Sequence, residues 1–108
     1  MAFTVLLTRH AARDLEELYD YVARHDAPGK AEHILGRIEA AFKSLSGSPQ
    51  RGAYPRELLA MGIREYREVF FKPYCLIFKV VGTKVYVLLI ADGRRDLQTL
   101  LQRRILEG

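Results

Sequence analysis

Residues 63–105 read IREYREVFFKPYCLIFKVVGTKVYVLLIADGRRDLQTLLQRRI, which is three strand-like runs joined by very short turns. Lys72-Pro73 marks the first turn, because proline has no N–H to donate to a β-ladder. Gly82-Thr83 has the Gly-X form of a two-residue type II′ hairpin turn. Strands joined so closely pair as neighbours, so the stretch predicts an antiparallel meander. Its strands are expected at Arg64–Phe71, Tyr74–Val81 and Lys84–Ala91.

The middle run is apolar at nearly every position from Tyr74 to Val81. Such a strand is typical of the centre of a sheet, where both faces are covered. The third run ends at Asp92-Gly93. Beyond that turn, apolar residues recur at helical spacing and predict a short terminal helix. They are Leu97, Leu100, Leu101 and Ile105.

The first half of the chain predicts a strand and two helices. Phe3–Leu7 is short and either β-branched or apolar throughout, as in a strand. Thr8 stands where an N-cap is expected, and an amphipathic helix follows from about Arg9 to His25. Asp26–Gly29 breaks this helix, and a second amphipathic helix ends near Ser46-Gly47. Two helices joined so closely are expected to lie antiparallel as a hairpin.

These elements follow the order β-α-α-β-β-β-α. The order predicts an α+β fold, in which an antiparallel sheet packs against the helical hairpin. Ser48–Pro55 is rich in turn-forming residues and is expected to be an exposed loop. The sequence contains no internal repeat and no long linker, so residues 1–108 are predicted to form a single domain.

Composition limits the cellular compartments in which the protein is expected. No apolar run approaches the roughly 20 residues that span a bilayer, and the N-terminus lacks the pattern of a secretory signal. The single cysteine, Cys75, cannot form an intrachain disulfide, which suits a reducing compartment. We therefore expect a cytoplasmic protein with no membrane partner. No residue spacing resembles a metal site or a Gly-rich phosphate loop, so we expect no cofactor.

The net charge of +4 is concentrated in the second half of the chain. Residues 1–50 contain six Lys and Arg against seven Asp and Glu, whereas residues 51–108 contain eleven against six. The basic half coincides with the predicted sheet, which indicates a polyanionic partner or an acidic protein segment. Ordinary solvated charge is the alternative interpretation.

Arg94 and Arg95 are the leading binding candidates, because they follow the last strand directly after Gly93. Exposed guanidinium groups bind phosphate or carboxylate in a bidentate manner. The alternative is that one of them pairs with a neighbouring aspartate and only stabilises the turn. Arg64 and Arg67 are three residues apart on a predicted strand, so they are expected to point to opposite faces. Of these two, we expect Arg67 to share a surface with Arg95.

The other chemically reactive side chains are expected to have structural roles. Tyr74 is expected in the core with its hydroxyl at the rim, and Cys75 is expected to be a small buried hydrophobe. The three histidines all fall on the two predicted helices of the hairpin, away from Arg95. The sequence therefore predicts no Cys–His nucleophilic pair.

The order of elements, the YREV-F…PY-LIFKV hairpin and the LIADGRRDLQTLLQRRI ending resemble the RelE/ParE superfamily of toxins from bacterial type II toxin–antitoxin systems. The resemblance covers nearly the whole chain. Its best-matched parts are Tyr66-Arg67, Tyr74 with the apolar strand after it, and Arg94-Arg95-Asp96. The superfamily has two branches that matter here: the RelE-like branch cleaves messenger RNA on the ribosome, and the ParE-like branch inhibits DNA gyrase.

The RelE-like pattern fits this chain only in part. Arg95 matches the arginine after the last strand and Arg67 matches one of the basic sheet positions; with Lys79 they would form the nuclease surface. Cys75 occupies the place of the central-strand arginine, and Leu101 or its neighbour Leu100 occupies that of a tyrosine in the terminal helix. A thiol supplies neither positive charge nor a strong donor for the charge that develops on phosphate.

The resemblance therefore favours the ParE-like branch, a toxin that binds its target and has no catalytic residues. A nuclease would need Glu65, Glu68 or a lysine as its base. The implied partners are a cognate antitoxin and DNA gyrase, or the ribosome and messenger RNA under the nuclease alternative; a third possibility is an inactive relative. The residues expected to bind the target are Arg67, Arg94, Arg95, Arg103 and Arg104.

Overall fold

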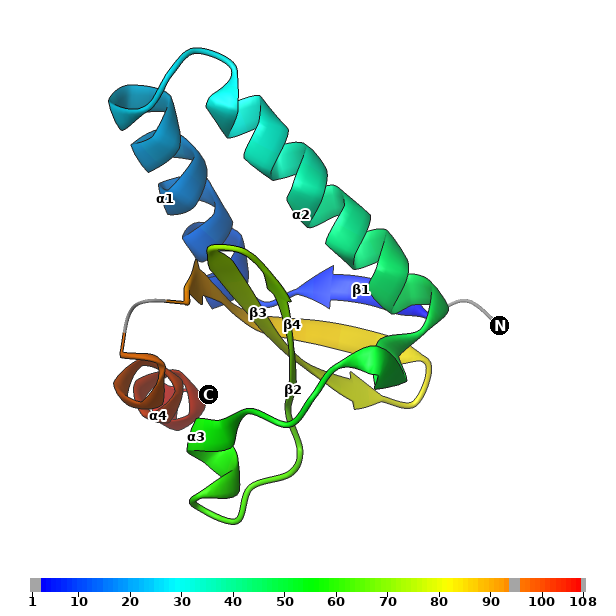
Figure 1. The fold of residues 1–108 in the computed structure, drawn as a ribbon. Coiled ribbons are helices and arrows are strands. Elements are labelled where there is room, and N and C mark those ends of the chain that lie inside the picture. Colours follow the sequence, from blue (N-terminus) through cyan, green and yellow to red (C-terminus); the bar gives the residue numbers. More distant parts are fainter. Residues whose placement is uncertain (1–2, 94–95, 108) are drawn as a thin grey trace.

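The computed structural model describes residues 3–93 and 96–107, whose arrangement is shown in Figure 1. The predicted order β-α-α-β-β-β-α is confirmed, with one short helix added before the second strand. The elements are β1 (Thr4–Leu7), α1 (Arg9–His25), α2 (Lys30–Gly47), a 3-10 turn (Pro49–Arg51), α3 (Arg56–Leu59), β2 (Arg67–Phe71), β3 (Tyr74–Val81), β4 (Lys84–Asp92) and α4 (Leu97–Glu107).

The four strands form one sheet in the order β1-β4-β3-β2. β2, β3 and β4 are antiparallel neighbours, so the predicted meander is confirmed. β1 pairs with β4 in parallel, from Thr4 opposite Lys84 to Leu7 opposite Val87. The prediction of an entirely antiparallel sheet is therefore wrong at β1. No tight turn joins β1 to β4, so turn geometry does not set their relative direction.

The local signals at the turns and at the first helix are confirmed. Gly82 has a φ of 62°, the left-handed value that the first position of a type II′ turn requires. The Lys72-Pro73 peptide bond in the other turn is cis. Thr8 caps α1, because its Oγ1 accepts a hydrogen bond from the Ala11 N–H at 3.2 Å. The same hydroxyl donates to the Val87 carbonyl at 3.0 Å, which joins the start of α1 to β4.

The loop predicted at Ser48–Pro55 is exposed only in part. Pro49, Gly52 and Pro55 are buried. Ala53 pairs with Glu68 in an isolated antiparallel bridge, with backbone hydrogen bonds of 3.0 and 2.7 Å. The turn-forming residues correctly predicted that the chain bends here, but they did not predict that it pairs with β2.

β2 begins three residues later than predicted, at Arg67. Arg64 precedes the strand, so the two-residue alternation of a strand does not apply to it. The prediction that Arg64 and Arg67 point to opposite faces is therefore wrong, and both line one hollow. Tyr66, immediately before the strand, is buried.

The sheet carries helices on both faces, but the coverage is unequal. α1 and α2 pack along one face, and α3 and α4 pack over one end of the other (Figure 1). β3 is buried from Tyr74 to Phe78, as predicted, but its last residue, Val81, is 52% exposed. No helix within residues 3–93 and 96–107 combines the length and the apolar character needed to cross a bilayer. The cluster under α1 and α2 contains Ala11, Leu45, Leu76, Phe78, Val85, Val87 and Ile90.

Candidate functional site

The face of the sheet under α3 and α4 is where the resemblance would place a nuclease surface. Cys75 on β3 and Leu101 on α4 both have no exposed surface, and they belong to one apolar cluster. Around these two residues, apolar side chains fill the space between the sheet and α4. The cluster consists of Leu58, Tyr66, Cys75, Ile77, Leu89, Ala91, Leu97 and Leu101.

The Cys75 thiol is inert in this environment. Its Sγ lies 3.7 Å from Glu68 Oε2, to which it donates a weak hydrogen bond. Burial raises the pKa of Cys75, and the nearby charges of Glu68 and Glu57 raise it further. Since the thiolate is the reactive form of cysteine, the side chain acts as a small buried hydrophobe, as predicted.

Glu68 is the carboxylate nearest to this face, and its own environment disfavours charge. Partial burial is the main cause that raises its pKa above the ordinary value of 4.5, and the Glu57 carboxylate adds repulsion. One carboxylate oxygen of Glu57, Oε2, is buried without a hydrogen-bond partner among the residues that the structure describes. Glu57 and Glu68 therefore place partly desolvated carboxylates beside the uncharged thiol of Cys75.

Glu68→Gln is expected to stabilise the protein at neutral pH. Because folding raises the pKa of Glu68, the favourable contribution is complete below about pH 4.5 and is lost as the pH rises through the folded-state pKa. The variant should therefore have a higher Tm than the wild type at pH 7 to 8, and the difference should shrink toward pH 4. Thermal unfolding over this pH range measures both, with the exposed Glu65→Gln as control. An equal Tm difference between the variant and the wild type at every pH would contradict the raised pKa of Glu68.

Arg67 and Lys79 lie where a basic hollow opens beside the end of β3. The hollow has a volume of about 400 Å³, and Arg64, Arg67 and Lys79 contribute its cations. Glu65 lies on the same rim. Lys79 extends over the ring of Tyr66, with its Nζ 5.8 Å from the ring centroid. We call this cavity, with the cations of Arg64, Arg67 and Lys79, the basic hollow.

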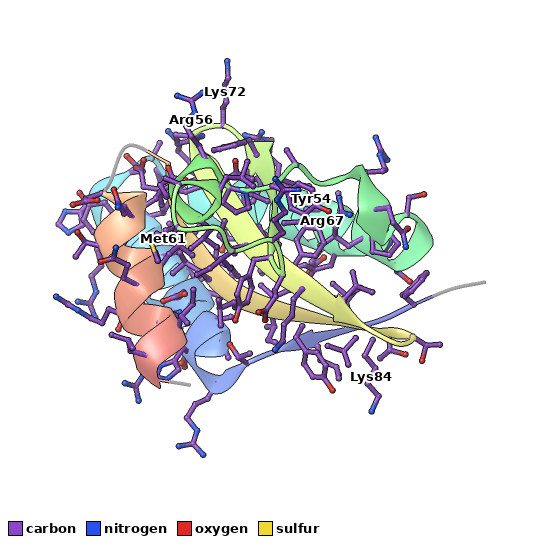
Figure 2. All side chains as sticks on the ribbon, turned by 90° about the horizontal axis from the view of Figure 1, so that it is seen from below. Tyr54, Arg56, Met61, Arg67, Lys72 and Lys84 are labelled. Carbon is purple, nitrogen blue, oxygen red and sulfur yellow. The ribbon has the colours of Figure 1, made fainter. Side chains whose placement is uncertain are left out.

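Arg67 is less free than the sequence suggested. Its guanidinium donates hydrogen bonds to the Gly52 carbonyl at 3.0 Å and to the Tyr54 hydroxyl at 3.2 Å. It also lies over the Tyr54 ring, 4.7 Å from the centroid, and the two side chains are seen together in Figure 2. Arg67 therefore anchors the segment before α3 to β2, and presents only part of its guanidinium to the hollow.

The two arginines of α4 have different environments. Arg103 is exposed. Arg104 is only 15% exposed, and its guanidinium binds both carboxylate oxygens of Asp14 at 2.8 and 3.1 Å. A further hydrogen bond, of 2.9 Å, joins it to the Leu88 carbonyl. Arg104 thus differs from the free cation expected there, because its hydrogen-bonding groups are committed within the molecule.

Sequence reasoning missed Asp14, which organises this region. Besides binding Arg104, its Oδ2 accepts the Ile90 N–H at 3.1 Å. Asp14 and Arg104 are 90 positions apart, so no local pattern could have paired them. Arg94 and Arg95, the leading sequence candidates, lie outside the described residues.

The histidines and the possible metal ligands can be placed among the described residues. The three histidines lie on α1 and α2, as predicted. Within residues 3–93 and 96–107, no three His, Cys, Asp or Glu side chains gather closely enough to hold a metal ion. The basic side chains of the described residues can bind anionic groups.

The model of the family described as "ParE toxin of type II toxin-antitoxin system, parDE" matches residues 5–97. The chain belongs to the ParE toxin family. A relative, toxin ParE3 of Caulobacter vibrioides, is 31% identical over 100 residues, which cover 93% of this chain and 96% of that protein. The predicted ParE-like branch is thereby confirmed.

Solved structures agree with this ParE family membership. The chromosomal ParDE toxin–antitoxin system from P. aeruginosa matches with a TM-score of 0.68 and 25% identity, over 84% of this chain and 96% of that one. The toxin–antitoxin complex RelBE2 from Mycobacterium tuberculosis matches with a TM-score of 0.60 and 25% identity, over 85% and 99% of the two chains. The RelE/ParE-like fold is confirmed.

Proposed function

We propose that this ParE-family toxin inhibits DNA gyrase by binding to it, and that a cognate antitoxin neutralises it. The observation that carries the proposal is the burial of Cys75 and Leu101 in one apolar cluster. Cleavage of RNA needs groups that move protons and stabilise charge on phosphate. The apolar packing at Cys75 and Leu101 supplies no cation for the charge on phosphate, whereas binding needs only an exposed and rigid surface.

We assign target binding to the basic side chains around the sheet and α4. Arg103 is exposed on α4, and the basic hollow adds Arg67 and Lys79. Arg94 and Arg95 are kept in the proposal on their sequence position alone. Arg104 is given a positioning role, because its ion pair with Asp14 fixes α4 against α1.

Controlled expression tests the proposal in cells. Expression of the toxin alone is expected to stop growth and to induce DNA-damage signalling, and co-expression of the cognate antitoxin is expected to restore growth. Translation arrest with cut transcripts would instead identify a ribosome-dependent ribonuclease. Unimpeded growth with a folded, abundant protein would identify an inactive relative.

A further inference from the structure

The sheet face that packs against α3 and α4 is open at its other end. There, Lys79 lies directly opposite Tyr86 in the register of β3 and β4, and Val81 lies opposite Lys84. Side chains two residues apart on one strand, and side chains directly opposed on neighbouring strands, share a face of the sheet. All four therefore lie on this open part of the face, and the 52% exposure of Val81 shows that the helices leave it uncovered.

A stripe of cations crosses the open face. Arg64 stands just before β2, Lys79 lies on β3, and Lys84 begins β4 at the tip of the β3–β4 hairpin, where Figure 2 labels it. Neighbouring strands are about 4.8 Å apart, so a stripe over three neighbouring segments spans roughly 10 Å. One strand of B-DNA carries a phosphate about every 3.4 Å along the helix axis, so a stripe of this length can meet about three phosphates.

The groups beside the cations also suit phosphate. Among the described residues that line the basic hollow and the cavity next to it, Glu65 is the one carboxylate. Gln50 lines the hollow, and Tyr86 lines the neighbouring cavity, which has a volume of about 310 Å³. Amide and hydroxyl side chains are common donors to DNA phosphates, together with lysine and arginine.

An acidic protein segment fits this surface less well. The backbone groups of β3 and β4 pair with each other across the sheet, so a peptide lying on its face would gain no main-chain hydrogen bonds there. Arg67 could bind a carboxylate with two nitrogens, but it already donates from both to Gly52 and Tyr54. The lysines act as point charges, which serve phosphate binding without bidentate geometry.

An unpaired base also lacks a platform here. Tyr66 is only 9% exposed, and the Lys79 ammonium group lies over its ring at 5.8 Å from the centroid. Binding of single strands depends on aromatic rings that are free to stack with bases. The covered ring of Tyr66 therefore favours contacts to the backbone of a duplex.

We infer that this open face binds the phosphate backbone of duplex DNA held by gyrase, through Arg64, Lys79 and Lys84. Because the contacts are to phosphate, the binding is independent of base sequence. The toxin thereby contacts the DNA as well as the enzyme. The inference rests on the proposed function, since gyrase supplies the DNA, and it names DNA as the partner of the basic hollow.

Binding of the purified chain to a labelled duplex of about 20 base pairs tests the inference, with fluorescence anisotropy as the readout. Lys79→Gln and Lys84→Gln are each expected to raise Kd several-fold and to lower the slope of log Kd against log salt by about 0.9. The losses should be equal for two unrelated base sequences. Lys79→Arg keeps the charge and should bind like the wild type.

Arg24→Gln is the matched control for charge. It removes the same single charge from an exposed position on α1 and should change Kd by less than about twofold. If Arg24→Gln and Lys84→Gln weakened binding equally, net charge alone would explain it and the inference would be overturned. Matching Tm values verify that the variants are folded.

Competitors identify the class of partner. Unlabelled duplex DNA is expected to displace the labelled duplex at a lower concentration than polyglutamate of equal charge. Displacement by polyglutamate at the same concentration would assign the surface to an acidic protein segment. Tighter binding of single-stranded DNA or RNA of the same length would assign it to unpaired bases, and either result would overturn the inference.

A gyrase supercoiling assay separates this inference from the proposed function. Inhibition by the wild type that is at least about tenfold weaker for the double variant Lys79→Gln/Lys84→Gln supports both. A double variant that inhibits as strongly as the wild type overturns the inference and leaves the proposed function standing. If the wild type does not inhibit gyrase, the proposed function fails, and the anisotropy measurement still decides whether this face binds DNA.

Discussion

Asp14→Ala is expected to lower the free energy of unfolding by about 3 kcal/mol, because it removes one partner of a mostly buried ion pair. The Arg104 guanidinium, 15% exposed, would keep its charge and lose both oxygens that neutralise it. The Ile90 N–H would lose its acceptor as well. Urea denaturation at neutral pH measures the loss, and hydrogen exchange in α4 should rise because the helix loses its anchor on α1.

Two comparison variants make this prediction specific. Glu16→Ala removes a carboxylate from the exposed side of the same helix and should change the stability by less than about 0.5 kcal/mol. Asp14→Asn keeps an acceptor without the charge, so its cost should fall between the other two. Equal stabilities of the Asp14→Ala and Glu16→Ala variants would show that the ion pair contributes nothing to the docking of α4.

Gly52→Ala is expected to be destabilising by about 2 kcal/mol, because no space exists for the added methyl group. A Cβ at this position would lie 2.8 Å from Phe78 Cζ and 3.0 Å from the Glu68 carbonyl oxygen. Phe78 is completely buried and the carbonyl belongs to the backbone of β2, so neither can move freely. The effect would appear as a lower Tm in thermal unfolding.

Gly36→Ala is the matched control for this substitution. Gly36 lies within α2, and a Cβ there would have no neighbour within 4 Å. Alanine in an exposed helix position is favoured over glycine by up to about 1 kcal/mol, so this variant should be more stable than the wild type. If both glycine variants were destabilised alike, the steric explanation for Gly52 would be wrong.

The parts of the fold that local patterns determine could be predicted from the sequence. The type II′ turn at Gly82 and the cap at Thr8 each follow from one residue and its immediate neighbours. The parallel pairing of β1 with β4 could not be predicted, because it depends on how the helical hairpin returns the chain to the sheet. The four-residue helix α3 is too short to give a helical repeat.

The candidate site was predictable in its residue types and less so in their environments. Cys75 and Leu101 could be recognised as departures from the nuclease pattern, but only the fold shows that they pack into one cluster. Arg67 and Arg104 could be identified as cations. Their commitment to Gly52 and Asp14 depends on long-range contacts, which composition and spacing do not contain.

The central claim is that this toxin acts by binding DNA gyrase, since apolar side chains fill the position where RNA chemistry would occur. The most direct test incubates the purified chain with gyrase and relaxed plasmid, and in parallel with ribosomes that carry a messenger RNA. We expect supercoiling to be inhibited and the messenger RNA to stay intact. Cleavage of the ribosome-bound message while supercoiling proceeds normally would contradict the account.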